Sequence, residues 1–187
     1  MPHIDLLDLP YFEGISVDGL VSLVDLMLPI RFDPGAVIVE EGSTQPAQLF
    51  IATRGKVLIS KKAPDGQVRR LAELSGPTLF GEIELFCELP SVCTAQAISQ
   101  VDAFKLDRPT FDRLFAAKNE ALMIFTFNVA RVTCHRLAIA DEMLTRVLAD
   151  EDLSALRESI WLQMRRKQSA GPSPMGNAIT GVFRKPT

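Results

Sequence analysis

The sequence predicts a mainly β protein with flanking helices, in which the strands form an antiparallel barrel or sandwich. Between residues 36 and 106, short apolar runs are separated by glycine and turn residues, with no long helical segment between them. Helical periodicity appears before and after this region. The chain has 187 residues, 47% of them hydrophobic and 23% charged, which is enough for one globular core and excludes disorder throughout. The same pattern disfavours a doubly wound α/β fold.

The first element is an amphipathic helix predicted for residues 16–28. Ser16 suits the N-cap position, and Pro29 is expected to end the helix. Apolar side chains recur there at helical spacing: Leu20, Leu23, Val24 and Met27.

The strands follow this helix as a series of short apolar runs. They are expected at residues 36–40, 49–53, 56–61, 68–74, 95–99 and 103–106. Between two of these runs, Pro64-Asp65-Gly66 combines a fixed φ with a glycine that can close a turn. Residues 56–74 are therefore predicted to form a β-hairpin.

Helical character returns at Asp107, with Pro109 suited to the first turn, and a longer helix is predicted for residues 119–148. Six side chains of the long helix are spaced alternately four and three apart, the period of a coiled-coil seam: Phe125, Val129, Val132, Arg136, Ile139 and Met143. The helix either packs on its own domain or joins a second copy, and we favour a homodimer through residues 119–148. Arg136 in this seam either reaches water or points at an anionic group near the dimer axis.

The chain after the long helix divides into two parts. Residues 152–167 predict a short amphipathic helix with a basic C-terminus, and residues 169–187 read as a flexible tail. We therefore predict one domain at residues 1–148, with its barrel at about 30–106, followed by a short helix within 149–168 and a tail at 169–187. A protein partner could dock at residues 153–187.

Charge and cysteine usage narrow the classes of partner. The net charge is −3; residues 157–187 carry six Lys or Arg and one Glu, or +5, which leaves −8 for the rest. An acidic body disfavours nucleic acid as a partner. Three scattered cysteines and two histidines form no metal-ligand pattern and suit a reducing compartment. The N-terminus resembles no signal peptide and no apolar run is long enough to cross a membrane, so we expect a cytoplasmic protein.

A glycine followed by a glutamate marks the most informative stretch, which consists of Phe80, Gly81, Glu82, Ile83, Glu84 and Leu85. Gly81 allows a helical turn to begin at a strand exit without a Cβ in the way. The amides that follow can point at a phosphate, and Glu82 can accept a hydrogen bond from a ribose hydroxyl. Alone, this pair is a weak signal of an anion site.

Around this pair the chain resembles the cyclic nucleotide-binding domain family, which includes catabolite activator proteins and protein kinase A regulatory subunits. The resemblance covers roughly residues 9–148 and rests on four segments: 9–12, 32–42, 49–57 and 80–85. It implies an eight-stranded jelly-roll-like barrel, or double-stranded β-helix, with a phosphate-binding cassette at residues 79–94. It also implies a long C-terminal helix that covers the ligand, cyclic AMP or cyclic GMP, and often dimerises.

The cassette departs from the family pattern at the residue that binds phosphate. Members that bind cyclic AMP carry a motif like Pro-Arg-Ala-Ala-Thr, whereas this chain has Pro90-Ser91-Val92-Cys93-Thr94. Ser91 takes the place of the arginine by the kinase-type spacing, and Val92 by the activator-type spacing. Loss of a bidentate contact worth roughly 1.5–3 kcal/mol predicts about tenfold to over a hundredfold weaker binding. Glu84 should repel a phosphodiester further.

Another cation could replace the missing arginine. Arg136 on the long helix is one candidate, and Arg69 or Arg70 on a strand is the other. Cys93 reads as a buried small residue rather than a reactive thiol.

Three functions follow from these residues. The first is a non-enzymatic sensor in which ligand binding shifts the long helix. The second is a ligand-independent dimeric scaffold that docks partners through Trp161 and the basic tail. The third, a transcription regulator of the activator type, is least favoured because about 39 residues follow Leu148. No nucleophile with an ordered base, metal cluster or P-loop appears, so no catalytic residue is assigned.

Overall fold

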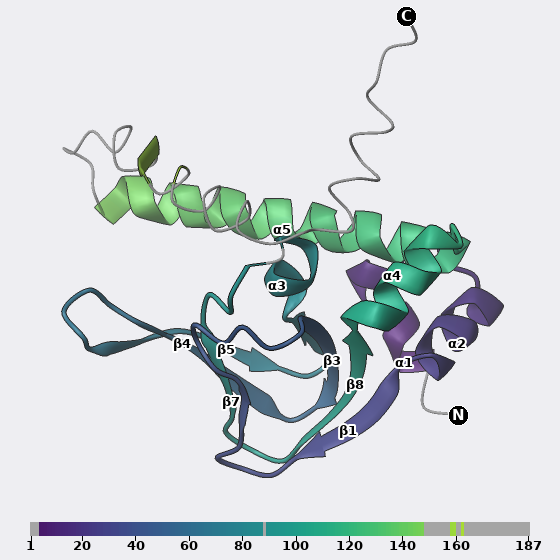
Figure 1. Cartoon of the computed structure of the whole chain (residues 1–187), viewed down its shortest axis with the longest axis horizontal. Helices are drawn as coiled ribbons and strands as arrows, with labels where there is room; N and C mark the ends of the chain where they lie inside the picture. Colours follow the sequence, from purple (N-terminus) through teal and green to yellow (C-terminus); the bar gives the residue numbers. More distant parts are fainter. Residues whose placement is uncertain (1–3, 88, 148–157, 160–161, 163–187) are drawn as a thin grey trace, which may run out of the picture.

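The computed structural model describes residues 4–87, 89–147, 158, 159 and 162, and it consists of a two-sheet β domain flanked by helices (Figure 1). The helices are α1 (Ile4–Leu7), η1 (Pro10–Phe12), α2 (Val17–Asp25), α3 (Glu82–Cys87), α4 (Arg108–Ala116) and α5 (Glu120–Val147). The strands are β1 (Leu28–Phe32), β2 (Val37–Val39), β3 (Gln48–Arg54), β4 (Lys56–Lys62), β5 (Val68–Ser75), β6 (Thr78–Phe80), β7 (Thr94–Ala97) and β8 (Val101–Asp107).

The strands pair into two four-stranded sheets, ordered β1-β8-β3-β6 and β2-β7-β4-β5. Every pairing is antiparallel. The predicted class, mainly β with flanking helices and a long C-terminal helix, is confirmed. The two sheets face each other as in a jelly roll.

Strand β3 shows how alternation builds two cores. Leu49 and Ile51 point to the helical side, where they join a cluster with residues of α1, α2, α4 and α5. Phe50 and Ala52 point between the sheets, where they meet residues of β4, β6, β7 and β8. All four side chains are at most 2% exposed, so β3 is buried on both faces. It therefore holds the helical layer on one sheet and the second sheet on the other.

The hairpin predicted for residues 56–74 is confirmed as β4 and β5. Gly66 has φ +83° in the turn and donates to the Ala63 carbonyl at 2.9 Å, while the Gln67 amide donates to Asp65 at 2.9 Å. Arg69 pairs with Asp65 at 3.0 Å, and both Arg69 and Arg70 are exposed. The prediction that either arginine might reach inward is therefore wrong.

Two strands and one helix end differ from the sequence-based expectation. Helix α2 is capped by the Ser16 side chain as predicted, but it ends at Asp25, and Pro29 lies inside β1. Strand β1 is an edge strand of its sheet, where a missing backbone donor is tolerated. Strand β6 has three residues and leads directly into Gly81. Both strands are too short to be recognised in the sequence from an alternation of apolar and polar residues.

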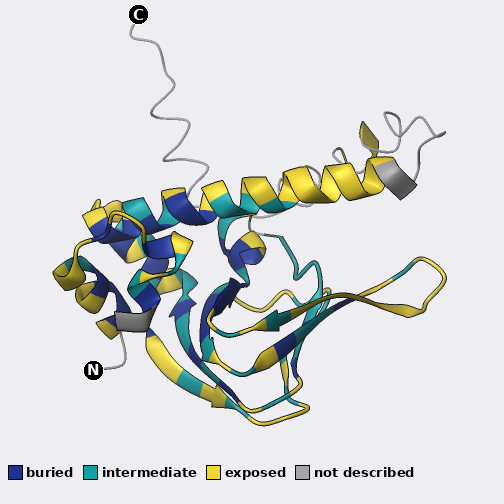
Figure 2. Ribbon diagram, turned by 180° about the vertical axis from the view of Figure 1, so that it is seen from behind, coloured by how far each residue is buried: buried dark blue, intermediate teal, exposed yellow. Residues whose placement is uncertain are grey.

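Helix α5 lies over the helical side of the domain and extends past it (Figure 1). Phe125 and Val129 are buried, at 0% and 1% exposure, and Val132 packs against the same core. The prediction that Phe125, Val129 and Val132 contact a second chain is therefore wrong, because these side chains pack on their own domain. Farther along, Ile139 and Met143 are exposed, and Figure 2 shows this end of the helix almost wholly exposed.

The remaining sequence predictions concern the C-terminal region. The predicted helix at 152–167 and the tail at 169–187 lie outside the described residues, except that 158, 159 and 162 are helical. Within the described part, no helix combines the length and apolar character that a membrane span requires.

Candidate functional site

Gly81 sits where the chain leaves β6 and enters α3. Its φ is +84°, and a Cβ at this position would lie 2.3 Å from the carbonyl oxygen of Gln48 on β3. Only glycine meets both conditions, because L residues rarely adopt this φ and no carbon fits so close to an oxygen. Gly81 therefore lets β6 pair tightly with β3 while the chain turns to place two glutamates on α3.

The Glu84 side chain points from α3 toward residues 90–94, the second half of the cassette. Its Oε1 accepts a hydrogen bond from the Val92 amide at 2.9 Å, and the residue is 8% exposed. A carboxylate thus occupies a backbone donor of the segment that carries the cyclic phosphate in the family motif. The stretch from Pro90 to Thr94 is held in place by a side chain of the protein itself.

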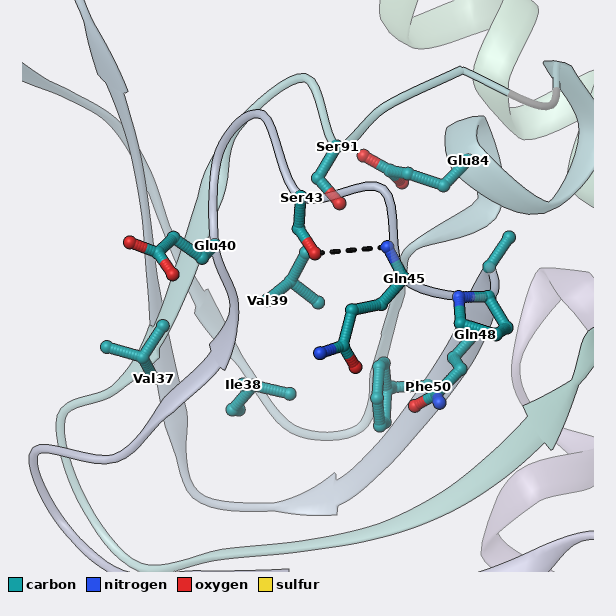
Figure 3. A pocket seen from close by; sticks show the side chains of 12 residues that line it. Val37, Ile38, Val39, Glu40, Ser43, Gln45, Gln48, Phe50, Glu84 and Ser91 are labelled. Carbon is teal, nitrogen blue, oxygen red and sulfur yellow. Dashed lines mark hydrogen bonds between the residues drawn. The ribbon is translucent and has the colours of Figure 1, made fainter.

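Ser91 is fixed through its backbone. Its amide donates to the Ser43 carbonyl at 3.0 Å, and its carbonyl accepts from the Gly42 amide at 2.7 Å. The loop between β2 and β3 therefore clamps the cassette, which leaves the Ser91 side chain at a cavity (Figure 3). By the kinase-type spacing, a serine hydroxyl therefore stands where family members that bind cyclic AMP carry the phosphate arginine.

Glu82 faces the opposite way, toward α5. Arg136 donates from Nη1 to Glu82 Oε1 at 3.2 Å and from Nη2 to the Tyr11 hydroxyl at 2.9 Å. Arg136 was expected either to reach water or to point at an anionic group near a dimer axis; here it pairs with Glu82 of its own chain and its side chain stays 40% exposed. The arginine links α5, α3 and η1, while Asn128 of α5 also donates to the Glu13 carbonyl at 2.7 Å.

The other predicted site residues have mainly structural positions. Phe80 is buried and stacks on Phe50 at 5.3 Å, and Leu85 is fully buried in the core. Ile83 is 36% exposed. Thr94 accepts from the Glu41 amide at 3.0 Å through its hydroxyl.

Glu84 and Ser91 line a cavity of about 280 Å³ between the cassette and β2 (Figure 3). The sequence did not point to the rest of its wall, which comes from residues 37–50: Val37, Ile38, Val39, Glu40, Ser43, Gln45, Pro46, Ala47, Gln48 and Phe50. Of the described residues that line it, two are carboxylates and none is Lys or Arg. This volume is just below the range for small-molecule sites, roughly 300–1,000 Å³.

The comparisons with known proteins decide the family. A sequence profile described as "Cyclic nucleotide-binding domain" matches residues 29–118, a range that contains the whole cassette. Residues 29–118 belong to the cyclic nucleotide-binding domain family.

Two curated relatives carry the same domain. A "CRP-like cAMP-activated global transcriptional regulator" from Mycobacterium tuberculosis is 29% identical over 109 residues, which cover 58% of this chain and 48% of that protein. A "cAMP-dependent protein kinase regulatory subunit" from Dictyostelium discoideum is 33% identical over 97 residues, which cover 50% of this chain and 29% of that protein. The chain thus matches about half or less of each curated relative.

Solved structures share the fold. The catabolite activator protein of Thermus thermophilus has a TM-score of 0.67 at 25% identity, over 74% of this chain and 63% of that one. A regulatory subunit of a cAMP-independent protein kinase A from Trypanosoma brucei has a TM-score of 0.59 at 23% identity, over 68% of this chain and 44% of that one. That structure is of a mutant bound to cAMP, in which Glu is replaced by Ala, Thr seven positions later by Arg, and Val at the next position by Ala.

The cysteines near this cyclic nucleotide-binding cassette are poor nucleophiles. Burial raises the pKa of both Cys87 and Cys93. Nearby carboxylates raise both further, whereas Lys61 opposes the rise at Cys93. The thiolate is the reactive form, so a raised pKa fits the expectation that Cys93 is not a reactive thiol, but Cys93 is half-buried rather than buried as predicted.

Burial also raises the pKa of Glu82, against the opposing effects of Arg136 and of a backbone hydrogen bond, while Glu84 adds to the rise. The folded domain then binds this proton more tightly than the unfolded chain does. Glu82 therefore favours folding most below its ordinary pKa of 4.5, and this contribution is lost as the pH rises through the raised pKa.

Replacement of Glu82 by Gln removes this titration. We expect the free energy of unfolding of the wild type, relative to Glu82→Gln, to fall as the pH is raised from below 4.5. Urea unfolding across a pH series measures the difference. A difference that grows with pH would mean that the Arg136 pair outweighs burial.

Proposed function

We propose that the chain is a non-enzymatic regulatory domain whose cassette is degenerate and binds cyclic nucleotides weakly or not at all. The hydrogen bond between Glu84 and the Val92 amide carries this proposal, because the donor is already taken by an internal anion. A second anion brought to the same place would meet like charge. At 4 Å and an effective dielectric constant of about 20, that repulsion is on the order of 4 kcal/mol.

The neighbouring cations do not offset this charge. Arg136 is held by Glu82 and Tyr11, and the Lys61 ammonium donates to the Val92 carbonyl at 2.5 Å while lying 3.8 Å from Glu41. Moving either cation to a phosphate would break contacts that already exist.

The substitutions described for the Trypanosoma brucei regulatory subunit lend support. They replace a glutamate, a threonine seven positions later and the valine that follows. This chain has Glu84, Ser91 and Val92 at the same spacing. In that protein the mutant bound to cAMP has alanine, arginine and alanine at these positions, which is the combination that the charge argument favours here.

Helix α5 is the proposed output element. Arg136 joins it to Glu82 and Tyr11, so side chains of the domain itself hold the helix on the cassette. A ligand or partner that competes for Glu82 would release α5, and a partner can read that movement.

Calorimetric titration of the wild type tests the proposal. With cyclic AMP and with cyclic GMP we expect dissociation constants at least tenfold above those of a family member that retains the phosphate arginine. A dissociation constant for either nucleotide within tenfold of that of the arginine-bearing member would contradict the degenerate cassette.

We also propose a homodimer, through a face of α5 different from the predicted seam. Seven exposed positions are spaced alternately four and three apart on the side opposite Phe125 and Val129: Met123, Phe127, Ala130, Cys134, Leu137, Asp141 and Leu144. Phe127 is 69% exposed and Leu137 is 57% exposed. A helix with two apolar faces usually buries both, and a heptad stripe suits a second helix of the same kind.

Light scattering of Phe127→Glu and Leu137→Glu tests this dimer. We expect each variant to be monomeric at concentrations where the wild type is a dimer. Ile139→Glu is the matched control, because Ile139 is 61% exposed but lies off the stripe. A monomeric wild type, or a control that dissociates equally, would contradict the proposed face.

The transcription-regulator alternative and the partner site at residues 153–187 both depend on the segment after α5. That segment lies outside the described residues, apart from three helical positions, so both stay predictions.

A further inference from the structure

A second groove, of about 780 Å³, lies on the sheet that contains β1, β8 and β3. Its described wall combines residues of these strands with Leu6 of α1 and with Pro77, which precedes β6. It shares no described lining residue with the cavity at the cassette. The volume lies within the range of small-molecule sites, roughly 300–1,000 Å³. The groove is therefore a separate candidate site, and the proposed function makes no use of it.

The floor of this groove is apolar. Phe104 of β8 packs against the helical core, and it pairs in register with Pro29 of β1. Leu6 belongs to the same core and lines the groove beside them, in agreement with the position of α1 next to β1 and β8 in Figure 1. Pro29 and Pro77 are exposed, so a ligand that covers this floor removes apolar surface from water.

Three charged side chains line the groove in one row across the sheet. Arg31 of β1 and Arg54 of β3 both pair in register with Asp102 of β8, the strand between them. Arg31 Nε donates to Asp102 Oδ1 at 2.6 Å, whereas the Arg54 guanidinium has no hydrogen bond or ion pair with any described residue. The row thus has one positive charge in excess, in a chain whose net charge is −3.

The backbone fixes the place of Arg54 in the groove. The register of β3 against β8 shifts between Ala52 and Arg54, and Thr53 and Arg54 both line the groove although they are consecutive in the strand. A β-bulge has this effect, because the extra residue redirects the side chain that follows it. A Cβ added to Gly76 would lie 2.8 Å from the Arg54 backbone nitrogen, so the turn before β6 packs directly on this residue. Arg54 is held at the groove, and the fold makes no use of its charge.

We propose that this groove binds a small amphipathic monocarboxylate, whose apolar chain or ring lies on Pro29 and Phe104 and whose carboxylate pairs with Arg54. A planar guanidinium can bind a carboxylate through two parallel hydrogen bonds. The excess of one positive charge matches a single carboxylate, whereas a phosphate monoester carries about −1.5 to −2 at pH 7 and would be repelled more strongly by Asp102. Medium-chain fatty acids are the simplest molecules of this class.

NMR titration of the full chain with octanoate tests the proposal. We expect saturable amide shifts at Arg31, Arg54 and Phe104 with millimolar ligand, and no shift at Ser91 or Val92 of the cassette. 1-Octanol has the same apolar chain without the charge. It should bind about tenfold more weakly than octanoate, because it lacks the charge-assisted contact to the guanidinium.

Arg54→Gln is the decisive variant. It should weaken octanoate about tenfold and leave the affinity for 1-octanol within about threefold of the wild type, because the change removes the charge and leaves the apolar floor. Arg70→Gln is the matched control, since Arg70 is an exposed arginine on β5 that does not line the groove, and it should leave the binding of both ligands unchanged. Matching thermal unfolding midpoints show that both variants fold.

Three results would overturn the inference: no saturable shift at the groove with millimolar octanoate, equal octanoate binding by the wild type and Arg54→Gln, or 1-octanol binding as tightly as octanoate. Tighter binding of octyl phosphate than of octanoate would overturn the assignment to a monocarboxylate. None of these results bears on the proposed function, because cyclic nucleotide binding is measured at residues that the groove does not include.

Discussion

Gly81→Ala is expected to lower the free energy of unfolding by roughly 2–5 kcal/mol, because it combines two costs. An L residue at φ +84° costs about 1–2 kcal/mol, and a methyl group 2.3 Å from the Gln48 oxygen forces β6 and β3 apart at a further cost of about 1–3 kcal/mol. Chemical denaturation of both proteins measures the difference.

Gly66→Ala is the matched control for this substitution. Gly66 has φ +83°, but nothing lies within 4 Å of the Cβ that would be added. It should cost only the backbone contribution, about 1–2 kcal/mol. Equal destabilisation by the two variants would show that close packing of the cassette against β3 is unimportant.

Glu84→Ala combined with Ser91→Arg is expected to tighten cyclic nucleotide binding by at least a hundredfold. The first change removes the internal carboxylate from the Val92 amide, and the second supplies a charge-assisted contact worth roughly 1.5–3 kcal/mol. Neither single change should reach this effect, because the two residues act on the same anion position.

Two controls accompany this gain of binding. Ser91→Lys places a charge without the planar fork of arginine and should give a smaller gain. Adding Val92→Ala to the double variant should tighten binding further or leave it unchanged. If the double variant binds no better than the wild type, the site has been lost for reasons other than charge, and the scaffold function is favoured.

The cassette could be predicted from sequence because its signal is local. A glycine before a glutamate at a strand exit has a direct backbone reason, and at Gly81 an added Cβ would indeed lie only 2.3 Å from the Gln48 carbonyl oxygen. The opposite orientations of Glu82 and Glu84 could not be predicted. They depend on α3, whose side chains point to α5 on one side and to the Pro90–Thr94 stretch on the other.

The wall of the cavity was missed for a related reason. Residues 37–50 appeared only as strand and loop, because nothing local indicates that the loop after Gly42 bonds to the backbone of Ser91. This contact joins segments about 50 residues apart, and it requires the register of both sheets. A short polar loop between two strands carries no such information in its composition.

The sequence also could not show which face of α5 packs on the domain. Phe125 and Val129 have the same alternating spacing as Met123 and Phe127, so periodicity identifies two apolar stripes without saying which packs inward. Tertiary packing chooses the first pair, which is buried, and leaves Met123 and Phe127 43% and 69% exposed.

The Val92 amide reports most directly on whether the cassette is occupied from within. By NMR, we expect this amide proton to be protected from exchange in the wild type, to lose protection in Glu84→Ala, and to keep its chemical shift when micromolar cyclic AMP is added to the wild type. A Val92 resonance that shifts with micromolar cyclic AMP, or that exchanges as fast in the wild type as in Glu84→Ala, would contradict internal occupation of the phosphate position.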